Sequence, residues 1–567
     1  MKYRWIFRKS NDDGAVQNLA KSLSIPEGLA RVLSARGLVG NSQAESFLSP
    51  SIEEIHDPFL MDGMEAAVER VERAVKSGEM IWIHGDYDVD GTASASMMLL
   101  FLREIGAKAQ YFIPHRQGDG YGLSAASINK AREAGTSLII TVDCGITSVE
   151  AVRLAASYGI DVIVCDHHEP GESQPDAVAI LDPIKPGCNY PFKYLAACGV
   201  AYKLIQALSI NRGESERAYN YLDFVAVASA ADIVPLIGEN RALVFAGLEL
   251  LNAIPRPGFK GLLDCADMNR NPITTSSIIF GLAPRINAAG RVGDARRAVE
   301  MMTQSDEVAA FAIAQELERD NRTRRTLDEF TFEQAFREAE AYLADGNRRS
   351  LVLHRDDWHA GVIGIVASRL VEKFHVPSIM LTTVDSYAKG SARSIKDFDI
   401  HGALKSCERF LLEFGGHKHA AGLSLSVENI PAFREEFDSI AHAAITNEMM
   451  IPELLIDTEL HLSELSPQFF ETIKKFAPFG HHNPKPVFYS RHVVSANGVK
   501  IVGNNHLKFR ALQSNFTIDA IGFNLGDKLA FCRNGRSFSI AYTLEENTHN
   551  GNVTPQISIK DLRPDSI

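Results

Sequence analysis

An alternation of short apolar strands with helices, starting near residue 65, constrains the fold of this chain more than any other feature. Amphipathic or apolar helical patterns such as MEAAVERVERAVKSG and ASASMMLLFLREIGA separate the predicted strands. In order, the strands read MIWIHGD, AQYFIP, SLIITVD and DVIVCD. Because this alternation is typical of a parallel sheet covered by helices, we predict an α/β fold here.

Ionisable side chains follow three of these strands, at the ends where open α/β sheets place their sites. A further group ends the apolar stretch FVAVASAADIVPL, which we interpret as a fourth strand. In sequence order the residues are His84, Asp86, Asp88 and Asp90 (IHGDYDVDG), Asp143 (TVDCGI), Asp166, His167 and His168 (VCDHHEP), and Asp232. Any one of them alone is more often a helix cap, a turn residue or a hydrogen-bonded core group.

Together these residues indicate a metal centre. Three carboxylates within five residues repel one another strongly unless cations neutralise them. Carboxylate and imidazole ligands without a thiolate favour Mn²⁺ or Mg²⁺ over zinc or an iron–sulfur cluster. We therefore expect the four segments to bring their side chains to one face around divalent cations.

The remainder of the chain suggests further domains. Residues 307–345 contain no Pro or Gly, which predicts one long helix joining two lobes. A second α/β unit starts at SLVLH, and short alternating strands near the C-terminus predict a small barrel. The first 55 residues have helical spacing, and we expect them to pack on the domain that follows. The predicted boundaries are 1–55, 56–306, 307–346, 347–450 and 451–567.

Charge is distributed unevenly along a chain whose net charge is −13. Residues 472–518 contain no Asp or Glu, where 71 acids in 567 residues would place about six. Lysines and arginines alternate there with aromatic residues, a combination that suits a groove for single-stranded nucleic acid. The alternative is an ordinary β-domain with its acids elsewhere and its aromatic side chains in the core. The stretch carries Lys474, Lys475, Lys485, Arg491, Lys500, Lys508 and Arg510, with Phe476, Phe479, Phe488, Tyr489, Phe509 and Phe516.

Composition also bears on the compartment. Seven widely spaced cysteines without a CxxC pair argue against a disulfide framework and a structural zinc site. The N-terminus MKYRWIFRKS has no apolar signal region, and the chain has no run of about 18 apolar residues that could span a bilayer. We expect a cytoplasmic protein with no membrane partner.

The ordered set DYDVDG, TVDCGI, DHH and ADIVPL resembles the four motifs of the DHH phosphoesterase superfamily. The strings PRINAAGRVGDA, WHAGVIGIVASR, KGSARSI and GGHKHAAG resemble the RecJ exonuclease family with its second, DHHA1-type lobe. FAPFGHHNPKPVF resembles the start of that family's OB-fold domain. The resemblance covers nearly the whole chain. It implies a parallel-sheet DHH domain, a long connecting helix, a smaller α/β DHHA1 domain and a C-terminal OB-fold β-barrel.

The resemblance further implies a 5′-to-3′ exonuclease that hydrolyses single-stranded DNA to mononucleotides in DNA repair and recombination. Two divalent cations would generate hydroxide from a bridging water and clamp the phosphate. Asp143 would bridge them, with His84 and Asp88 on one side and Asp90, His167 and Asp232 on the other. Asp86 would ligate or support its neighbours, and His168 would lie near the scissile phosphate. A single-strand-binding protein and a repair helicase are the further partners that the family suggests.

Phosphate anchors beyond the metals should include arginines, because their guanidinium groups contact phosphate in a bidentate way. The resemblance supports Ser391, Arg393 and His417 as substrate contacts. The other candidates are Arg116, Arg285, Asn287 and Arg291. For each arginine, a solvated or ion-paired surface role is the alternative.

Two other functions compete with this one. A phosphodiesterase of short oligonucleotides or cyclic dinucleotides would share the metal motifs, but it would have no obvious use for the C-terminal module. A DNA-tethering protein with a decayed site is disfavoured, because every motif carboxylate and both DHH histidines are present.

Overall fold

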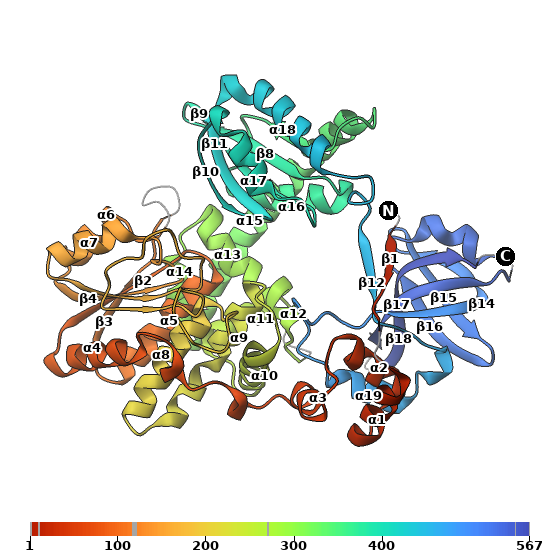
Figure 1. The fold of residues 1–567 in the computed structure, drawn as a ribbon, viewed down its shortest axis with the longest axis horizontal. Helices are drawn as coiled ribbons and strands as arrows, with labels where there is room; N and C mark the ends of the chain where they lie inside the picture. The colour runs from red at the N-terminus through yellow and green to blue at the C-terminus, as the bar shows by residue number, and fades with distance from the viewer. Residues whose placement is uncertain are drawn as a thin grey trace. The chain divides into compact units, whose positions relative to one another are not determined.

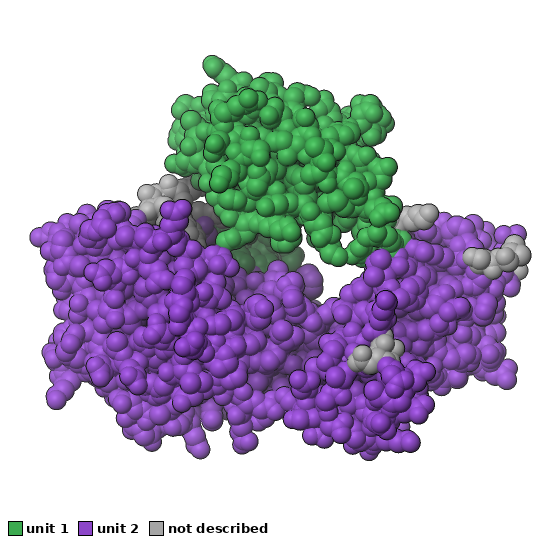
Figure 2. Space-filling view, in the orientation of Figure 1, with its two compact units in different colours: residues 1–4, 284–298, 312–453 green, residues 5–283, 299–311, 454–567 purple. Residues whose placement is uncertain are grey.

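The computed structural model describes residues 3–9, 12–115, 122–268, 272–533, 535–549 and 552–565, without the side chains of residues 497, 548, 549, 552 and 553. The chain divides into two compact units, coloured separately in Figure 2. The smaller unit holds residues 1–4, 284–298 and 312–453, and the larger one holds residues 5–283, 299–311 and 454–567. Within the described ranges, no helix combines the length and the apolar composition that crossing a bilayer requires.

A five-stranded sheet lies at the centre of the α/β domain in the larger unit (Figure 1). All four strand pairs, in the order β3-β2-β4-β5-β6, are parallel, so the carboxyl ends of the strands share one edge. The predicted parallel α/β fold is confirmed. The strands are β2 (Met80–Gly85), β3 (Lys108–Phe112), β4 (Thr136–Val142), β5 (Asp161–Cys165) and β6 (Ala179–Leu181).

Helices alternate with strands β2 to β5 along the chain, and a further run of helices comes after β6, the last strand of this sheet. The stretch before Asp232 is helix α9, so its interpretation as a fourth strand was wrong. An apolar run that is buried on every side has the same pattern in a strand and in a core helix, and the alanines in VAVASAA favour the helix. The helices are α4 (Met64–Ser77), α5 (Val89–Glu104), α6 (Ala125–Glu133), α7 (Val149–Ser157), α8 (Ala197–Asn211), α9 (Leu222–Ala231), α10 (Gly238–Ala253), α11 (Pro257–Cys265) and α12 (Thr275–Ser277), followed by a π-helical turn (Ile278–Leu282).

The smaller unit contains a second α/β domain with a five-stranded sheet in the order β10-β11-β9-β8-β7. Only β7 and β8 pair in parallel; the other three pairs are antiparallel. The predicted long helix is present as α15, although its first turns cluster with the larger unit. The elements are α13 (Ala283–Val292), α14 (Arg296–Thr303), α15 (Glu307–Leu343), β7 (Leu351–His354), α16 (Ile363–Phe374), β8 (Ser378–Val384), β9 (Tyr387–Arg393), α17 (Ile400–Ser406), β10 (Leu411–His417), β11 (Ala420–Ser426) and α18 (Ile430–Ala444).

The C-terminal strands form the predicted barrel. The sheet order is β13-β14-β15-β16-β18-β17, and an additional β14–β17 pairing closes it. Its elements are β13 (Thr458–Glu459), α19 (Pro467–Lys474), β14 (Phe488–Val502), β15 (His506–Gln513), β16 (Phe516–Gly522), β17 (Phe538–His549) and β18 (Asn552–Pro564). A short strand β1 (Arg4–Phe7) pairs separately with β12 (Glu453–Ile456).

The N-terminal helices share a core with this barrel. Leu19, Leu29 and Leu33 belong to the same buried cluster as Phe469 and Phe488. The expectation that the first 55 residues pack on the following domain was therefore wrong for residues 13–35, but Phe47 does contact that domain, because the Arg241 guanidinium lies 4.0 Å from its ring centroid and donates to its carbonyl oxygen. Sequence periodicity showed that these helices have an apolar face, but it could not show which partner covers that face. The helices are α1 (Asp13–Leu23), α2 (Glu27–Ala35) and α3 (Asn41–Leu48).

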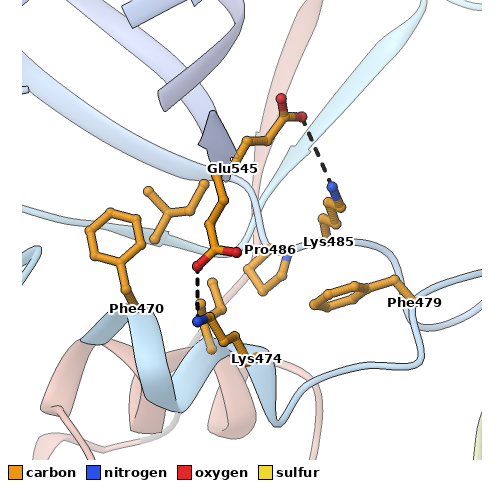
Figure 3. A pocket seen from close by; sticks show the side chains of 9 residues that line it. Phe470, Lys474, Phe479, Lys485, Pro486 and Glu545 are labelled. Atoms are coloured by element: carbon orange, nitrogen blue, oxygen red, sulfur yellow. Dashed lines mark ion pairs between the residues drawn. The ribbon is translucent and has the colours of Figure 1, made fainter. Parts of the chain in front are cut away.

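Residues 472–518 contain no Asp or Glu, but in the structure acidic side chains from other segments lie beside their basic side chains. Lys474 pairs with Glu546 at 2.9 Å, and Lys485 lies 4.0 Å from Glu545, both beside a cavity of about 220 Å³ (Figure 3). Arg491 pairs with Glu459 at 2.8 Å, and Arg510 lies 3.8 Å from Asp519. Three of the aromatic residues, Phe476, Phe488 and Phe509, lie in the core, as the alternative interpretation predicted.

Candidate metal centre and substrate contacts

The turn between β2 and α5 presents the first acidic cluster. The carboxylate of Asp88 caps α5 by accepting hydrogen bonds from the backbone amides of Asp90 and Gly91 at 2.9 and 3.2 Å. A Cβ at Gly91 would lie 2.5 Å from the backbone of Asp86, so only glycine fits this turn. Because a helix N-terminus stabilises negative charge, the DYDVDG segment can hold several carboxylates here.

Asp90 lies deeper, and its side chain is 1% exposed. Its two carboxylate oxygens accept hydrogen bonds from the backbone amides of Ala197 and Cys198 at 2.7 and 2.8 Å, where α8 begins. Burial, together with the charge of Asp88, nevertheless raises the pKa of Asp90 to about 7. The site therefore disfavours this negative charge unless a cation is present.

Two more carboxylates come from separate elements. Asp143 follows β4 with a left-handed φ of 63°, and Asp232 follows α9. Burial and the neighbouring aspartates raise the pKa of Asp143 well above its ordinary value. Burial, with the charges of Asp90 and Asp88, raises the pKa of Asp232 to about 8.

His167 is central to this arrangement. Its Nε2 atom lies 3.3 Å from Asp143 Oδ1, 3.8 Å from Asp232 Oδ2 and 3.9 Å from Asp90 Oδ2. Burial and the charge of His168 lower the pKa of His167 to about 4, so its imidazole is neutral at pH 7. A neutral imidazole among carboxylates is a good donor for a divalent cation.

His168 has the opposite character because of Asp166. The Asp166 carboxylate accepts hydrogen bonds from the backbone amides of His167 and Ile146 and lies 2.7 Å from His168 Nδ1. Burial alone would lower the pKa of His168, but this contact and the charge of Asp166 raise it to about 9. His168 is therefore a cation at neutral pH, and about a third of its side chain is exposed.

Three overlapping groups of side chains could each hold a metal ion, because their ligand atoms lie within 4.8 Å of one another. The groups share Asp143 or His167, as expected of neighbouring cation sites. The donor set of buried, mutually repelling carboxylates with a neutral imidazole fits divalent cations. The groups are Asp143, His167 and His168; Asp90, His167 and Asp232; and Asp86, Asp88 and Asp143.

Among the residues that the structure describes, His84 belongs to none of these three groups. It is fully buried in β2, and its Nε2 lies 3.2 Å from the carbonyl oxygen of Gly122. Its role as a ligand stays a prediction. Sequence reasoning missed Asp182, which is buried directly after β6 and whose pKa burial raises to about 7. Its position after the apolar run AVAIL was the available signal.

In the smaller unit, Ser391 and Arg393 lie together on β9. Arg393 Nη1 donates a hydrogen bond to Ser391 Oγ at 2.9 Å. A Cβ at Gly364 would lie 2.9 Å from Ser391 Oγ and 3.1 Å from Arg393 Nη2, which places both side chains at the start of α16. A hydroxyl, a guanidinium and a helix N-terminus suit an anion. His417 is exposed at the end of β10.

The remaining predicted phosphate anchors make different contacts within the protein. Arg285 is buried and pairs with Glu318 at 2.7 Å, so it fixes α13 to α15. Arg291 Nη1 donates to the carbonyl oxygen of Gly361 at 3.1 Å, and Asn287 is half-buried. Their contacts with substrate stay predictions, and Arg116 lies outside the described residues.

Comparison with known families agrees with this architecture. The model of the DHH family, N-terminal domain, matches residues 80–229, the DHHA1 domain matches residues 347–443, and the RecJ OB domain matches residues 456–561.

Relatives with the name RecJ match nearly the whole chain. The single-stranded-DNA-specific exonuclease RecJ of Bacillus subtilis is 36% identical over 99% of this chain and 71% of its own length. The Escherichia coli protein of the same name is 33% identical over 95% of this chain and 96% of its own length. The structure of RecJ in complex with Mn²⁺ from Thermus thermophilus has a TM-score of 0.86, is 29% identical, and covers 100% of this chain and 80% of that chain. The chain thus belongs to the RecJ family of metal-dependent, single-stranded-DNA-specific exonucleases within the DHH superfamily.

Proposed function

We propose that this exonuclease degrades single-stranded DNA from the 5′ end to mononucleotides, using two divalent cations, Mn²⁺ or Mg²⁺, in DNA repair and recombination. The carrying observation is that His167 Nε2 lies within 3.3–3.9 Å of three carboxylates from three different segments. Structures of RecJ from Thermus thermophilus with Mn²⁺ and with Mg²⁺ support the choice of metals.

Asp143 supports a pair of ions because its Oδ1 lies 3.3 Å from His167 Nε2, and it also belongs to a separate group of possible ligands with Asp86 and Asp88. Asp90 and Asp232 complete the side that contains His167. When bound, the cations would supply the charge that acidifies a water and offsets the negative phosphate. Asp166 would orient both histidines, because its carboxylate accepts a hydrogen bond from the backbone amide of His167 and lies 2.7 Å from the ring Nδ1 of His168.

His168 is the chain's own electrophile in this proposal. Because it stays protonated at neutral pH, its imidazolium can donate a hydrogen bond to a non-bridging phosphate oxygen and favour the charge that develops there. Ser391 and Arg393 at the start of α16 are the proposed contacts for the 5′-terminal phosphate. Arg291, Asn287, His417 and Arg116 remain proposed contacts along the strand.

The test compares Asp143→Ala with Glu150→Ala, which removes a surface carboxylate that is 81% exposed. Both are assayed on single strands blocked covalently at either end, on duplexes and on cyclic dinucleotides. We expect the Glu150 variant to release mononucleotides only from single strands with a free 5′ end. The Asp143 variant should release none while still binding the strand in chelator. Hydrolysis by the Asp143 variant, or attack on strands blocked at the 5′ end, would refute the corresponding part of the proposal.

A further inference from the structure

The turn that carries Asp232 has an unfavourable backbone conformation. Ile233 follows it with a φ of 60°, in the left-handed region that β-branched side chains rarely adopt. Helix α9 fixes only the start of this turn, through the hydrogen bond that the Asp232 amide donates to the carbonyl oxygen of Ala228 at 2.9 Å. Such a conformation persists only where its surroundings fix it, so something must also hold the far end.

The far end is held by a segment more than 200 residues away in the sequence, residues 475–484, which we name the proline loop. The Leu236 amide donates to the carbonyl oxygen of His481 at 2.8 Å. A Cβ at Gly480 would lie 2.5 Å from Leu236 Cδ1, so loop and turn are in close contact. Thr275 Oγ1 donates to the carbonyl oxygen of Phe479 at 2.6 Å, which fixes the loop from a second side.

The proline loop is itself held rigidly against α10. Arg241 is 2% exposed, and its guanidinium donates to the carbonyl oxygens of Lys475, Phe476, Ala477 and Pro478 at 2.7–3.3 Å. The side chain of Asn483 donates to two of the same carbonyl oxygens, both at 2.9 Å. Each backbone carbonyl oxygen from residue 475 to residue 481 thus accepts a hydrogen bond, so the loop can act as a stiff support.

We propose that the proline loop, which leads into the barrel, is a positioning element for the metal centre and fixes the turn that presents Asp232. Gly480 and Thr275 are the positioning residues, and they act through Leu236 and the loop backbone. The inference rests on the proposed role of Asp232 as a metal ligand. It extends the site beyond the α/β domain, because residues that never contact the cations would then help to set their affinity.

The central experiment measures Mn²⁺ binding to the full chain by calorimetry and the Mn²⁺ concentration for half-maximal hydrolysis. Gly480→Ala should push Leu236 away and raise both the dissociation constant and this concentration about tenfold, the lower end of what groups that orient metal ligands contribute. Binding of single-stranded DNA in chelator should not change. Leu236→Ala in the same chain removes the atoms that the new methyl group meets, so the double variant should recover much of the Mn²⁺ affinity.

Matched variants separate positioning from loss of folding. Gly40→Ala, in the same unit, gains a methyl group whose nearest neighbour is 3.6 Å away, and it should behave as the parent chain. Thr275→Val removes only the hydroxyl that binds the loop. It should raise the Mn²⁺ requirement severalfold even if Gly480→Ala does not fold.

Asp232→Ala tells the two proposals apart. If Asp232→Ala weakens Mn²⁺ binding but the Gly480 and Thr275 variants match the parent chain, the support role of the loop is refuted and the ligand role stands. If Asp232→Ala leaves Mn²⁺ binding unchanged, the ligand role is refuted, and the support role with it.

Discussion

Asp166→Asn is the substitution that tests most directly why His168 of the DHH motif is charged at neutral pH while its neighbour His167 is neutral. The Asp166 carboxylate is 1% exposed. One oxygen accepts hydrogen bonds from the amides of His167 and His168 and lies 2.7 Å from His168 Nδ1, and the other accepts from the Ile146 amide at 3.0 Å. Asparagine keeps the shape but turns one oxygen into a donor, which would face the Ile146 amide, and it removes the charge beside His168.

The size of the effect follows from these contacts. A hydrogen bond to a charged group is worth about 1.5–3 kcal/mol, and 1.4 kcal/mol corresponds to a factor of about ten. If the hydrogen bond between Asp166 and His168 is needed for His168 to stabilise the transition state, Asp166→Asn should lower kcat roughly 10- to 100-fold. The pKa of His168 should also fall from about 9 toward its ordinary value near 6.5.

The assay is the release of mononucleotides from a single-stranded oligonucleotide at saturating Mn²⁺, measured from pH 6 to pH 9. The parent chain should keep His168 charged up to about pH 9. The variant should lose activity at a lower pH, because its His168 deprotonates earlier. Asp176→Asn, an exposed aspartate of the same domain, is the control. A variant with the kcat and the pH profile of the parent chain would show that Asp166 does not set the charge of His168.

Two further predictions concern metal removal and the barrel. In chelator, the pKa values of Asp90 (about 7) and Asp232 (about 8) in the native state exceed those in the unfolded chain. The native state therefore binds more protons than the unfolded state between about pH 4 and pH 8. Because of this difference, the free energy of unfolding should fall as the pH rises through that range. Saturating Mn²⁺ should remove this slope in thermal unfolding, and parallel curves with and without Mn²⁺ would contradict the assignment. In the barrel, Lys500→Ala with Lys508→Ala should reduce the slope of log K against log salt by about 1.4 if each lysine contacts one phosphate of a single strand. Lys474→Ala should change this slope little, because Glu471 and Glu546 already pair with Lys474. If Lys474→Ala reduced the slope as much as the double variant does, Lys500 and Lys508 would not be the particular contacts for the strand.

The parallel sheet and its acidic strand ends could be predicted because the evidence for them is local. Asp143 and Asp166 each follow an apolar strand directly, and parallel strands bring their ends to one edge. The helix before Asp232 could not be distinguished from a strand by pattern, although the position of Asp232 beside the other acids did not depend on that distinction. Asp166 shows the limit of such reasoning, since only its contacts in the structure with His167 and His168 separate a residue that orients a ligand from a ligand.

The barrel shows why a window of sequence composition misjudges a charged surface. Strand pairing places residues opposite each other that the sequence keeps apart, so Arg510 faces Asp519 although it lies in the acid-free stretch. The same pairing places Lys500 directly opposite Lys508 on β14 and β15. Like charges in that relation are destabilising, and a bound phosphate would relieve the repulsion. This cross-strand pair is therefore a better candidate for contact with a DNA backbone than residues 472–518 as a whole.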